Sequence, residues 1–391
     1  MRVIHVITRL IVGGAQENTV TSVLGLRKKP DLEVSLISGP TEGPEGSLES
    51  LFSSCPSALR ILPELVRPVR LWKDRKALKR LTALFRAEAP DLVHTHSGKA
   101  GVIGRLAAAR AGVPLIIHTI HGPSFGSFQG TAANILFRAA ERRAGRVTNH
   151  FVVVADAMKE QYLQAGIGRP DQYTRVLSGF NLEPFLSATN DLRLRAKLGF
   201  TPEDIIVGKV ARLFKLKGHD DLFAAAPELV QRCPQIKFLL VGDGPWRQRF
   251  EDRTRALGLE KRFVFTGLVQ PGEVAPLMGI MDCLVHLSSR EGLPRALPQA
   301  LAAGRPVVAY DCDGAKEVCV DDETGFLVPP GDLLALKNCL LRLANDNALR
   351  RRLGERGRQF VRERFGAQQM VDELYQLYLR LGTASRPISA N

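Results

Sequence analysis

Short runs of apolar, mostly β-branched residues recur along the chain, and longer stretches with helical spacing of apolar positions separate them. In the first half, the runs that we predict as strands are Val3–Ile7, Val34–Ser38, Leu92–His94, Leu115–Thr119 and Phe151–Val154. The predicted helices between them are residues 16–28, 73–87, 99–111 and 131–144. Strands that alternate with helices predict a parallel sheet with helices on both faces.

The same pattern starts again in the second half of the chain. Its predicted strands are Ile205–Val210, Lys237–Val241, Phe263–Phe265, Cys283–Leu287 and Pro306–Ala309, and its predicted helices are 218–231, 245–257, 295–303 and 332–344. Two complete series predict an α/β protein with two Rossmann-like, doubly wound domains. We expect the domains to cover residues 1–180 and 181–365, joined near 178–190. The tail 354–381 is predicted as one helix, whose part from about 366 to 381 packs back on the first domain.

The composition excludes several classes of protein. The chain has 391 residues, of which 45% are hydrophobic and 24% charged, so a disordered, collagen-like or coiled-coil chain is excluded. No apolar run is long enough to cross a membrane, and the first residues are interpreted as a strand rather than a signal peptide. The six cysteines include no Cys-x-x-Cys pair, which argues against a zinc site. We therefore expect a cytoplasmic protein.

The formal net charge is +14, and much of the excess lies in the first half. Residues 67–86 contain one acid, Asp74, and eight basic residues: Arg67, Arg70, Lys73, Arg75, Lys76, Lys79, Arg80 and Arg86. One interpretation is a helix that buries Leu71, Leu78, Leu81 and Phe85 and leaves its basic face in water. The other is adsorption to anionic lipid at the inner face of a membrane. Few aromatic residues are interleaved and no nucleic-acid-binding motif is present, so nucleic acid is not an expected partner.

Glycines and cations follow several predicted strands, where ligands bind in open α/β sheets. Gly13 and Gly14 precede the first helix, whose free N–H groups could bind an anion. Arg212 and Lys217 follow the first strand of the second domain, where they could bind a phosphate or remain solvated. Gly242 and Gly244 fit a nucleotide-binding loop or an ordinary turn equally well.

The densest segment runs from Ser288 to Val308. In it a strand ends, Glu291 follows, and Gly292-Leu293-Pro294 make a turn into a short helix that carries Gln299. Glu291 could accept hydrogen bonds from sugar hydroxyls. Gln299 could face the same ligand or lie in solvent.

Histidines stand at two strand ends of the first domain, in His94-Thr95-His96 and His118-Thr119-Ile120-His121. An acid–base or substrate-orienting role fits this position. The sequence shows no third metal ligand of suitable type and spacing, so no metal site is predicted. His5, inside the first strand, is interpreted equally well as a core residue.

Together these motifs resemble those of glycosyltransferase family 4, the retaining enzymes of GT-B fold, over essentially the whole chain. The residues that carry the resemblance are Gly13-Gly14-Ala15-Gln16, His94-Thr95-His96 with the following AGVIGRLAAARAGVP, His118-Thr119-Ile120-His121-Gly122, Arg212 with Lys217-Gly218, Gly242-Asp243-Gly244-Pro245, and Glu291-Gly292-Leu293-Pro294 through Pro306-Val307-Val308. The resemblance implies two domains that face a central cleft. It implies a nucleotide-sugar donor on the C-terminal domain and an acceptor on the N-terminal one.

Site roles also follow from this resemblance. Arg212 and Lys217 match the pair that binds the donor diphosphate, Glu291 matches a contact to the donor sugar, and His121 matches a histidine near the anomeric carbon; these four are the expected catalytic residues. The expected donor-binding residues are Gly13, Gly14, Gly242, Gly244, Gly292, Leu293, Pro294 and Gln299. No cofactor or metal ion is expected.

The chain departs from the family pattern at Gln299, where the E-x7-E motif has its second glutamate. A glutamine carbonyl still accepts a hydrogen bond, but without charge, so we expect weaker donor binding. The expected function is retaining, metal-independent transfer of a sugar to a hydroxyl acceptor, a glycan or lipid-linked glycan in surface polysaccharide or glycolipid synthesis. A GT-B-fold nucleotide-sugar epimerase and a non-catalytic donor-binding protein remain alternatives.

Overall fold

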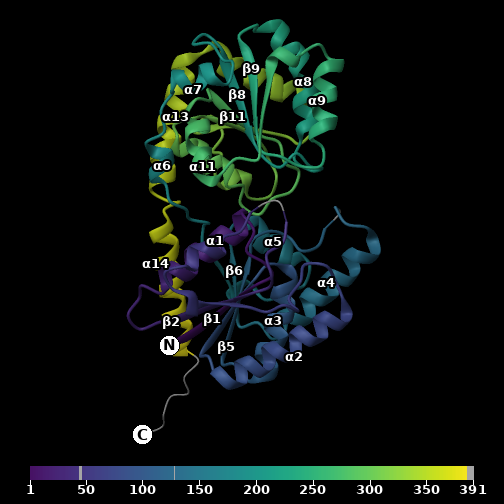
Figure 1. Cartoon of the computed structure of the whole chain (residues 1–391), viewed down its shortest axis with the longest axis vertical. Coiled ribbons are helices and arrows are strands. Elements are labelled where there is room, and N and C mark those ends of the chain that lie inside the picture. Colours follow the sequence, from purple (N-terminus) through teal and green to yellow (C-terminus); the bar gives the residue numbers. More distant parts are fainter. Residues whose placement is uncertain (44–45, 127, 385–391) are drawn as a thin grey trace. The chain divides into compact units, whose positions relative to one another are not determined.

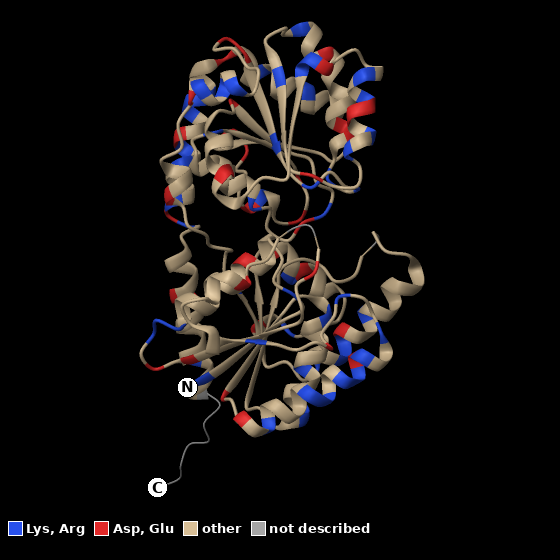
Figure 2. Cartoon of the chain, in the orientation of Figure 1, with Lys and Arg blue, Asp and Glu red and all other residues tan. Residues whose placement is uncertain are grey.

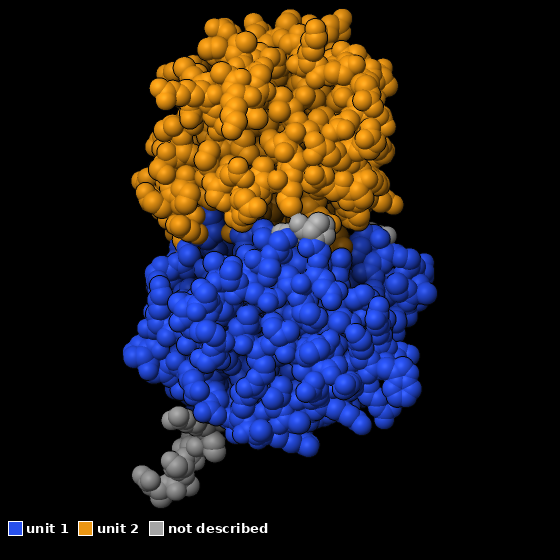
Figure 3. Space-filling view, viewed as in Figure 1, with its two compact units in different colours: residues 1–180, 367–391 blue, residues 181–366 orange. Residues whose placement is uncertain are grey.

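The computed structural model describes residues 1–43, 46–126 and 128–384. The chain divides into two compact units (Figure 3). Unit 1 consists of residues 1–180 together with the segment from Ala367 onward, and unit 2 consists of residues 181–366.

Unit 1 contains a seven-stranded parallel sheet in the order β3-β2-β1-β4-β5-β6-β7. Its strands are β1 (Arg2–Ile7), β2 (Glu33–Ser38), β3 (Leu59–Ile61), β4 (Leu92–His96), β5 (Leu115–Ile120), β6 (His150–Val153) and β7 (Tyr173–Arg175). The strand order reverses between β1 and β4, which makes their carboxyl ends the expected place for a ligand.

In the described part of unit 1, α-helices cover this sheet (Figure 1). They are α1 (Gly14–Leu26), α2 (Leu71–Glu88), α3 (Gly98–Ala111), α4 (Thr131–Gly145), α5 (Asp156–Gln164) and α14 (Ala367–Ala384). The C-terminal helix α14 packs on α1 and buries Met370, Leu374, Leu377 and Tyr378 in the unit 1 core. The contact is close, since a Cβ atom added to Gly25 would lie 2.4 Å from Val371 Cγ2.

Unit 2 contains a six-stranded parallel sheet in the order β10-β9-β8-β11-β12-β13. Its strands are β8 (Ile205–Val210), β9 (Ile236–Val241), β10 (Phe263–Gly267), β11 (Cys283–His286), β12 (Val307–Tyr310) and β13 (Gly325–Val328). Its α-helices are α6 (Glu183–Leu186), α7 (Leu192–Lys197), α8 (His219–Arg232), α9 (Arg247–Ala256), α10 (Val274–Gly279), α11 (Ala296–Ala302), α12 (Leu333–Asn345) and α13 (Asn347–Arg362). The predicted pair of doubly wound parallel sheets is therefore confirmed.

Two sequence predictions need correction. The strands β3, β7 and β13 were not predicted, because runs of three or four residues at or near a sheet edge are too short to show a periodicity. The predicted continuous helix 354–381 is wrong. The helix ends at Arg362, Phe365 is buried, and the backbone N–H of Ala367 donates to the Phe180 carbonyl (3.1 Å) as α14 begins.

None of the described helices is long and apolar enough to cross a membrane.

Candidate functional site

Two loops are joined at the carboxyl edge of the unit 2 sheet. The loop after β8 and the loop after β9 exchange backbone hydrogen bonds, with Leu213 N–H donating to the Asp243 carbonyl (3.0 Å) and Trp246 N–H donating to the Leu213 carbonyl (3.1 Å). A Cβ atom on Gly242 or Gly244 would lie 2.4 Å from the carbonyl oxygen of Ala211 or Leu213. These glycines are therefore required for the packing of the loops, whatever ligand they also meet.

Lys217 and Glu291 form an ion pair at this edge, between the loop that precedes α8 and the loop that follows β11. His286, the last residue of β11, has its Nε2 atom 3.4 Å from Glu291 Oε1. The backbone N–H of Glu291 donates to Asp313 Oδ2 (2.7 Å), which fixes the glutamate loop. The structure thus brings together two of the four predicted catalytic residues and adds His286 and Asp313, which sequence reasoning missed.

Burial and neighbouring charges shift the pKa values of the groups in this cluster. Burial acts to raise the pKa of Glu291, but His286 and Lys217 outweigh it and hold the pKa well below its usual value. Burial lowers the pKa of His286, although Glu291 acts in the opposite direction. The buried Lys209 of β8, whose Nζ has no hydrogen-bond partner in the described residues, has its pKa lowered to about 7 by burial and then by Lys217. Glu291 is therefore held ionised next to the Lys217 ammonium group.

The remaining predicted donor residues lie on the same loops. Arg212 is exposed after β8, with its guanidinium carbon 5.8 Å from the centre of the Phe214 ring. Gly292, Leu293 and Pro294 are buried, and the Gly292 carbonyl accepts a hydrogen bond from Gly314 N–H (3.1 Å).

Gln299 is the fourth residue of α11 and is half-buried. Its side chain makes no hydrogen bond to any residue that the structure describes, so its amide is available to a ligand.

In unit 1, Gly13 and Gly14 lie where α1 begins, shortly after the carboxyl end of β1. Gly13 has an extended backbone (φ 174°), and its carbonyl accepts from Glu17 N–H at 2.9 Å. Free amide groups in the first turn of a helix bind anions, and the donor-binding role of this loop stays a prediction.

His121 follows the carboxyl end of β5 and is half-buried, with its Nε2 atom 3.1 Å from His96 Nδ1. Three further ring nitrogens, one each from His5, His94 and His96, lie within 4.8 Å of one another. The sequence shows no third metal ligand of suitable spacing beside His94 and His96, but the structure places His5 next to them. Only the pairing of His5 with His94 in neighbouring strands brings the third ring into place.

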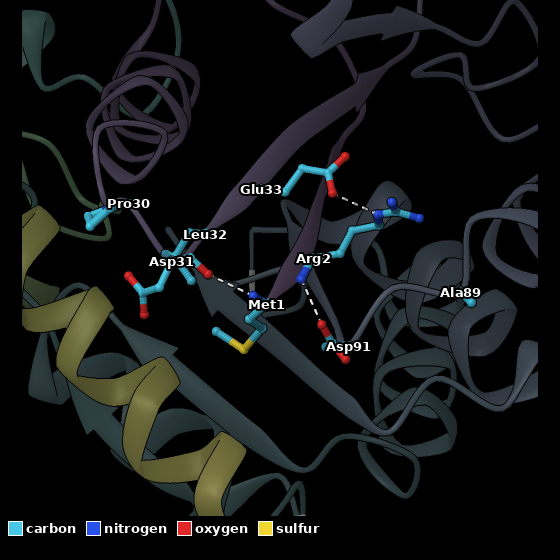
Figure 4. Close-up of a pocket in the computed structure, with 8 residues that line it drawn as sticks. All are labelled: Met1, Arg2, Pro30, Asp31, Leu32, Glu33, Ala89 and Asp91. Atoms are coloured by element: carbon cyan, nitrogen blue, oxygen red, sulfur yellow. Dashed lines mark hydrogen bonds and ion pairs between the residues drawn. The ribbon is translucent and has the colours of Figure 1, made fainter.

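A hollow at the opposite, amino edge of the unit 1 sheet is lined by polar groups that satisfy one another (Figure 4). Arg2 N–H donates to Asp91 Oδ2 (2.7 Å), and the Arg2 guanidinium pairs with Glu33 (3.1 Å). Its place away from the strand carboxyl ends gives it no part in the predicted site.

The basic segment forms α2 and the turn before it, and Lys and Arg gather along this helix (Figure 2). Its buried residues are Ala77, Leu81, Thr82 and Phe85, so the prediction that Leu71 belongs to the buried face is wrong. Leu71 is 82% exposed and Trp72 86% exposed, because the helix begins at Leu71 and its first turn projects beyond the core.

Comparison with known proteins finds two family models that match consecutive parts of the chain. A "Glycosyl transferase 4-like domain" model matches residues 13–179, and the "Glycosyl transferases group 1" model matches residues 190–360.

The curated relatives of this chain include named glycosyltransferases. The UDP-Gal:alpha-D-GlcNAc-diphosphoundecaprenol alpha-1,3-galactosyltransferase of Escherichia coli is 27% identical over 387 residues, which cover 97% of each chain. The putative glycosyltransferase EpsD of Bacillus subtilis is 29% identical over 76% of this chain and 79% of its own. Among solved structures, Anabaena Alr3699/HepE in complex with UDP and glucose has a TM-score of 0.82, at 22% identity over 97% of this chain and 100% of that one. This last likeness establishes the fold, which is GT-B.

Proposed function

The chain belongs to the group 1 glycosyl transferases, and from this premise we propose that it moves a sugar from a nucleoside-diphosphate sugar to a hydroxyl group of a lipid-linked glycan, with retention of the anomeric configuration. The Escherichia coli relative, whose name gives UDP-galactose as donor and a diphosphoundecaprenol-linked sugar as acceptor, supports this choice of substrates. UDP-galactose is therefore the first donor to test.

The observation that carries the proposal is the cluster of Lys217, Glu291 and His286 at the carboxyl edge of the unit 2 sheet. Lys217 precedes α8 by two residues, so its ammonium group and the free amides of the first turn of α8 can act on the same anion. Glu291, held ionised, can accept hydrogen bonds from sugar hydroxyls. A diphosphate joined to a sugar has the chemistry that these two neighbouring groups recognise.

The proposed mechanism depends on charge stabilisation of the leaving group. As the bond between the anomeric carbon and the diphosphate breaks, negative charge grows on the phosphate oxygens. Lys217, Arg212 and the amides of α8 stabilise that charge, so no metal ion is required in this proposal. The acceptor hydroxyl attacks the face that the diphosphate leaves, and the leaving phosphate removes its proton, which preserves the anomeric configuration.

The test is a thermal-shift and product assay with UDP-galactose, UDP-glucose, UDP-GlcNAc and GDP-mannose, with and without EDTA. A donor at 100 times its dissociation constant should stabilise the protein by about 2.7 kcal/mol. Lys217→Ala should lose this shift and the transfer, whereas Lys215→Ala, which removes an exposed cation from the same loop, should keep both. NMR of the glycosylated product should show the anomeric configuration of the donor.

Three results would contradict the proposal. A product with inverted configuration would exclude the retaining mechanism. Interconversion of the donor sugar without any acceptor would identify an epimerase, and a thermal shift without turnover, even on lipid extract, would identify a non-catalytic donor-binding protein.

We also propose that α2 contacts an anionic membrane at its inner face, where the lipid-linked acceptor would be held. The exposed Val69, Leu71 and Trp72 stand beside Arg70 and Lys73, a combination typical of segments that lie in a membrane interface. Lys76 and Arg80 are paired with Glu64, so these cations have a partner within the fold. Each remaining basic residue near an anionic surface contributes about 1 kcal/mol.

Sedimentation with vesicles tests this contact. The protein should bind vesicles that contain phosphatidylglycerol and release them at high salt. Replacement of Leu71 and Trp72 by serine should weaken binding at least tenfold, given about 25 cal/mol per Å² of apolar surface. The same change at Ile135 and Leu136 of α4, which are also exposed, is the control, and equal loss in both variants would exclude α2 as the contact.

A further inference from the structure

A continuous chain of hydrogen-bonded side chains begins at Thr119 of β5, passes through β4, α14 and β1, and returns to His121 at the end of β5. Its contacts are Thr119 Oγ1 to His94 Nε2 (2.6 Å), His94 Nδ1 to the Tyr378 hydroxyl, the Tyr378 hydroxyl to His5 Nε2 (3.3 Å), His5 Nδ1 to His96 Nε2 (2.9 Å), and His96 Nδ1 to His121 Nε2 (3.1 Å). Every member except His121 is at most 3% exposed. All ring nitrogens of His5, His94 and His96 are used inside the chain.

The hydrogen bonds of such a chain must all run in one direction, from donor to acceptor. A neutral imidazole carries one proton, so it donates from one nitrogen and accepts at the other. The Tyr378 hydroxyl has a single hydrogen, so it donates to one histidine and accepts from the other. Burial lowers the pKa of His5 to about 3 and that of His121 to about 4, which keeps these rings neutral near pH 7. The direction of any one hydrogen bond therefore fixes the other four.

Thr119 decides the direction. Its buried hydroxyl has no hydrogen-bond partner other than His94 among the described side chains. If His94 donated to Thr119, the hydroxyl hydrogen of Thr119 would be buried without an acceptor, which is costly. If Thr119 donates to His94, every hydrogen in the buried part is satisfied. At the other end, His121 is half-buried and its Nδ1 can meet solvent or ligand in either role.

We propose that this chain is a positioning device for His121: it holds the imidazole with its proton on Nδ1, so that His121 serves as a hydrogen-bond donor to a bound sugar and not as a base. The identity of the ligand rests on the proposed function, but the tautomer does not. Thr119, His94, Tyr378, His5 and His96 act through His121 and touch no substrate themselves. This role explains why four histidines and a tyrosine from β1, β4, the end of β5 and α14 meet in one core.

The tautomer of His121 is measured directly on the full chain labelled with ¹⁵N-histidine. The nitrogen signals of His121 are assigned by their loss in His121→Gln. We expect a protonated Nδ1 and an unprotonated Nε2 between pH 6 and 8. A protonated Nε2 would overturn the proposal, whether or not the protein transfers a sugar.

Two variants of the same residue separate positioning from packing. His96→Leu removes the donor to His121 and should abolish the preference for one tautomer and lower kcat about tenfold, the loss expected for one hydrogen bond. His96→Gln can accept from His5 and donate to His121, so it should restore the tautomer and bring kcat to within about twofold of the wild type.

The control is His118→Leu, which removes an equally buried imidazole that makes its contacts with Thr95 outside the chain. It should leave the tautomer of His121 unchanged. Equal behaviour of His96→Leu and His96→Gln in the tautomer measurement would overturn the proposal. So would a transition metal retained in stoichiometric amount by the purified protein, because a nitrogen bound to metal can no longer take part in the chain.

Discussion

At the scale of single residues, Gln299 is the departure from the family pattern with the clearest chemical consequence. Its amide makes no hydrogen bond within the described structure, and it lies on α11, five residues after the buried Gly292-Leu293-Pro294 turn. The side chain therefore keeps the place of the motif carboxylate while lacking its charge.

We predict that Gln299→Glu tightens donor binding. A carboxylate accepts hydrogen bonds about twice as strongly as an amide carbonyl, a gain of about 1 kcal/mol, or about fivefold in the dissociation constant. Calorimetric titration with the donor identified above measures this. Gln248→Glu, on the exposed part of α9, is the control, and unchanged or weaker binding in Gln299→Glu would show that Gln299 does not face the donor.

At the scale of elements, the contact between α1 and α14 joins the two ends of the chain within unit 1. Gly25 lets the helices approach, and Asn18 donates to Ser178 Oγ (2.8 Å) beside Met370, which fixes the register of α14 on the sheet. The same helix delivers Tyr378 to the histidine chain. Displacement of α14 would therefore disturb the histidine chain that ends at His121 as well as the core of unit 1.

We predict that Gly25→Ala lowers the melting temperature, because its Cβ atom would lie 2.4 Å from Val371 Cγ2. Overpacking of this kind costs about 1–3 kcal/mol. Val371→Ala in the same protein should recover part of the loss, so the two changes should couple in a double-mutant cycle. Gly272→Ala, where no atom lies within 4 Å of the added Cβ, is the control. Simple additivity at Gly25 and Val371 would contradict the close contact.

At the scale of the whole molecule, the buried histidines link stability to pH. The pKa values of His5, His94, His96, His118 and His121 are all lowered, in each case first by burial. In the unfolded chain these groups take up protons below a pH of about 6.5, whereas the folded chain does not until a much lower pH. Unfolding is therefore favoured as the pH falls.

We predict that the contribution of these histidines to the free energy of unfolding is constant above a pH of about 7 and declines as the pH falls from about 6.5 toward the pKa of about 4 of His121. Each histidine adds a slope of up to about 1.4 kcal/mol per pH unit. Urea unfolding at several pH values measures this, and carboxylates contribute little above pH 5. His96→Gln should reduce the slope by the contribution of one histidine, which is up to about 1.4 kcal/mol per pH unit. Equal stability at pH 7.5 and 5.5 would contradict the burial of neutral histidines.

The two parallel sheets could be predicted from the sequence, since buried strands and amphipathic helices each leave a periodic pattern that local physical chemistry imposes. The sequence also indicated the loops of Arg212, Lys217 and Glu291, because ligand-binding groups in α/β sheets follow strand ends directly along the chain. Three-residue edge strands left no such pattern, and neither did the break between α13 and α14.

Contacts between residues distant in sequence could be seen only in the folded chain. Asp313, which follows β12, binds the backbone of the Glu291 loop that follows β11, and His5 meets His94 only because β1 pairs with β4. Tyr378, more than two hundred residues from either histidine, completes the chain through the packing of α14. Hydrophobic periodicity reports which face of an element is buried, but it carries no information about which polar groups will meet inside that face.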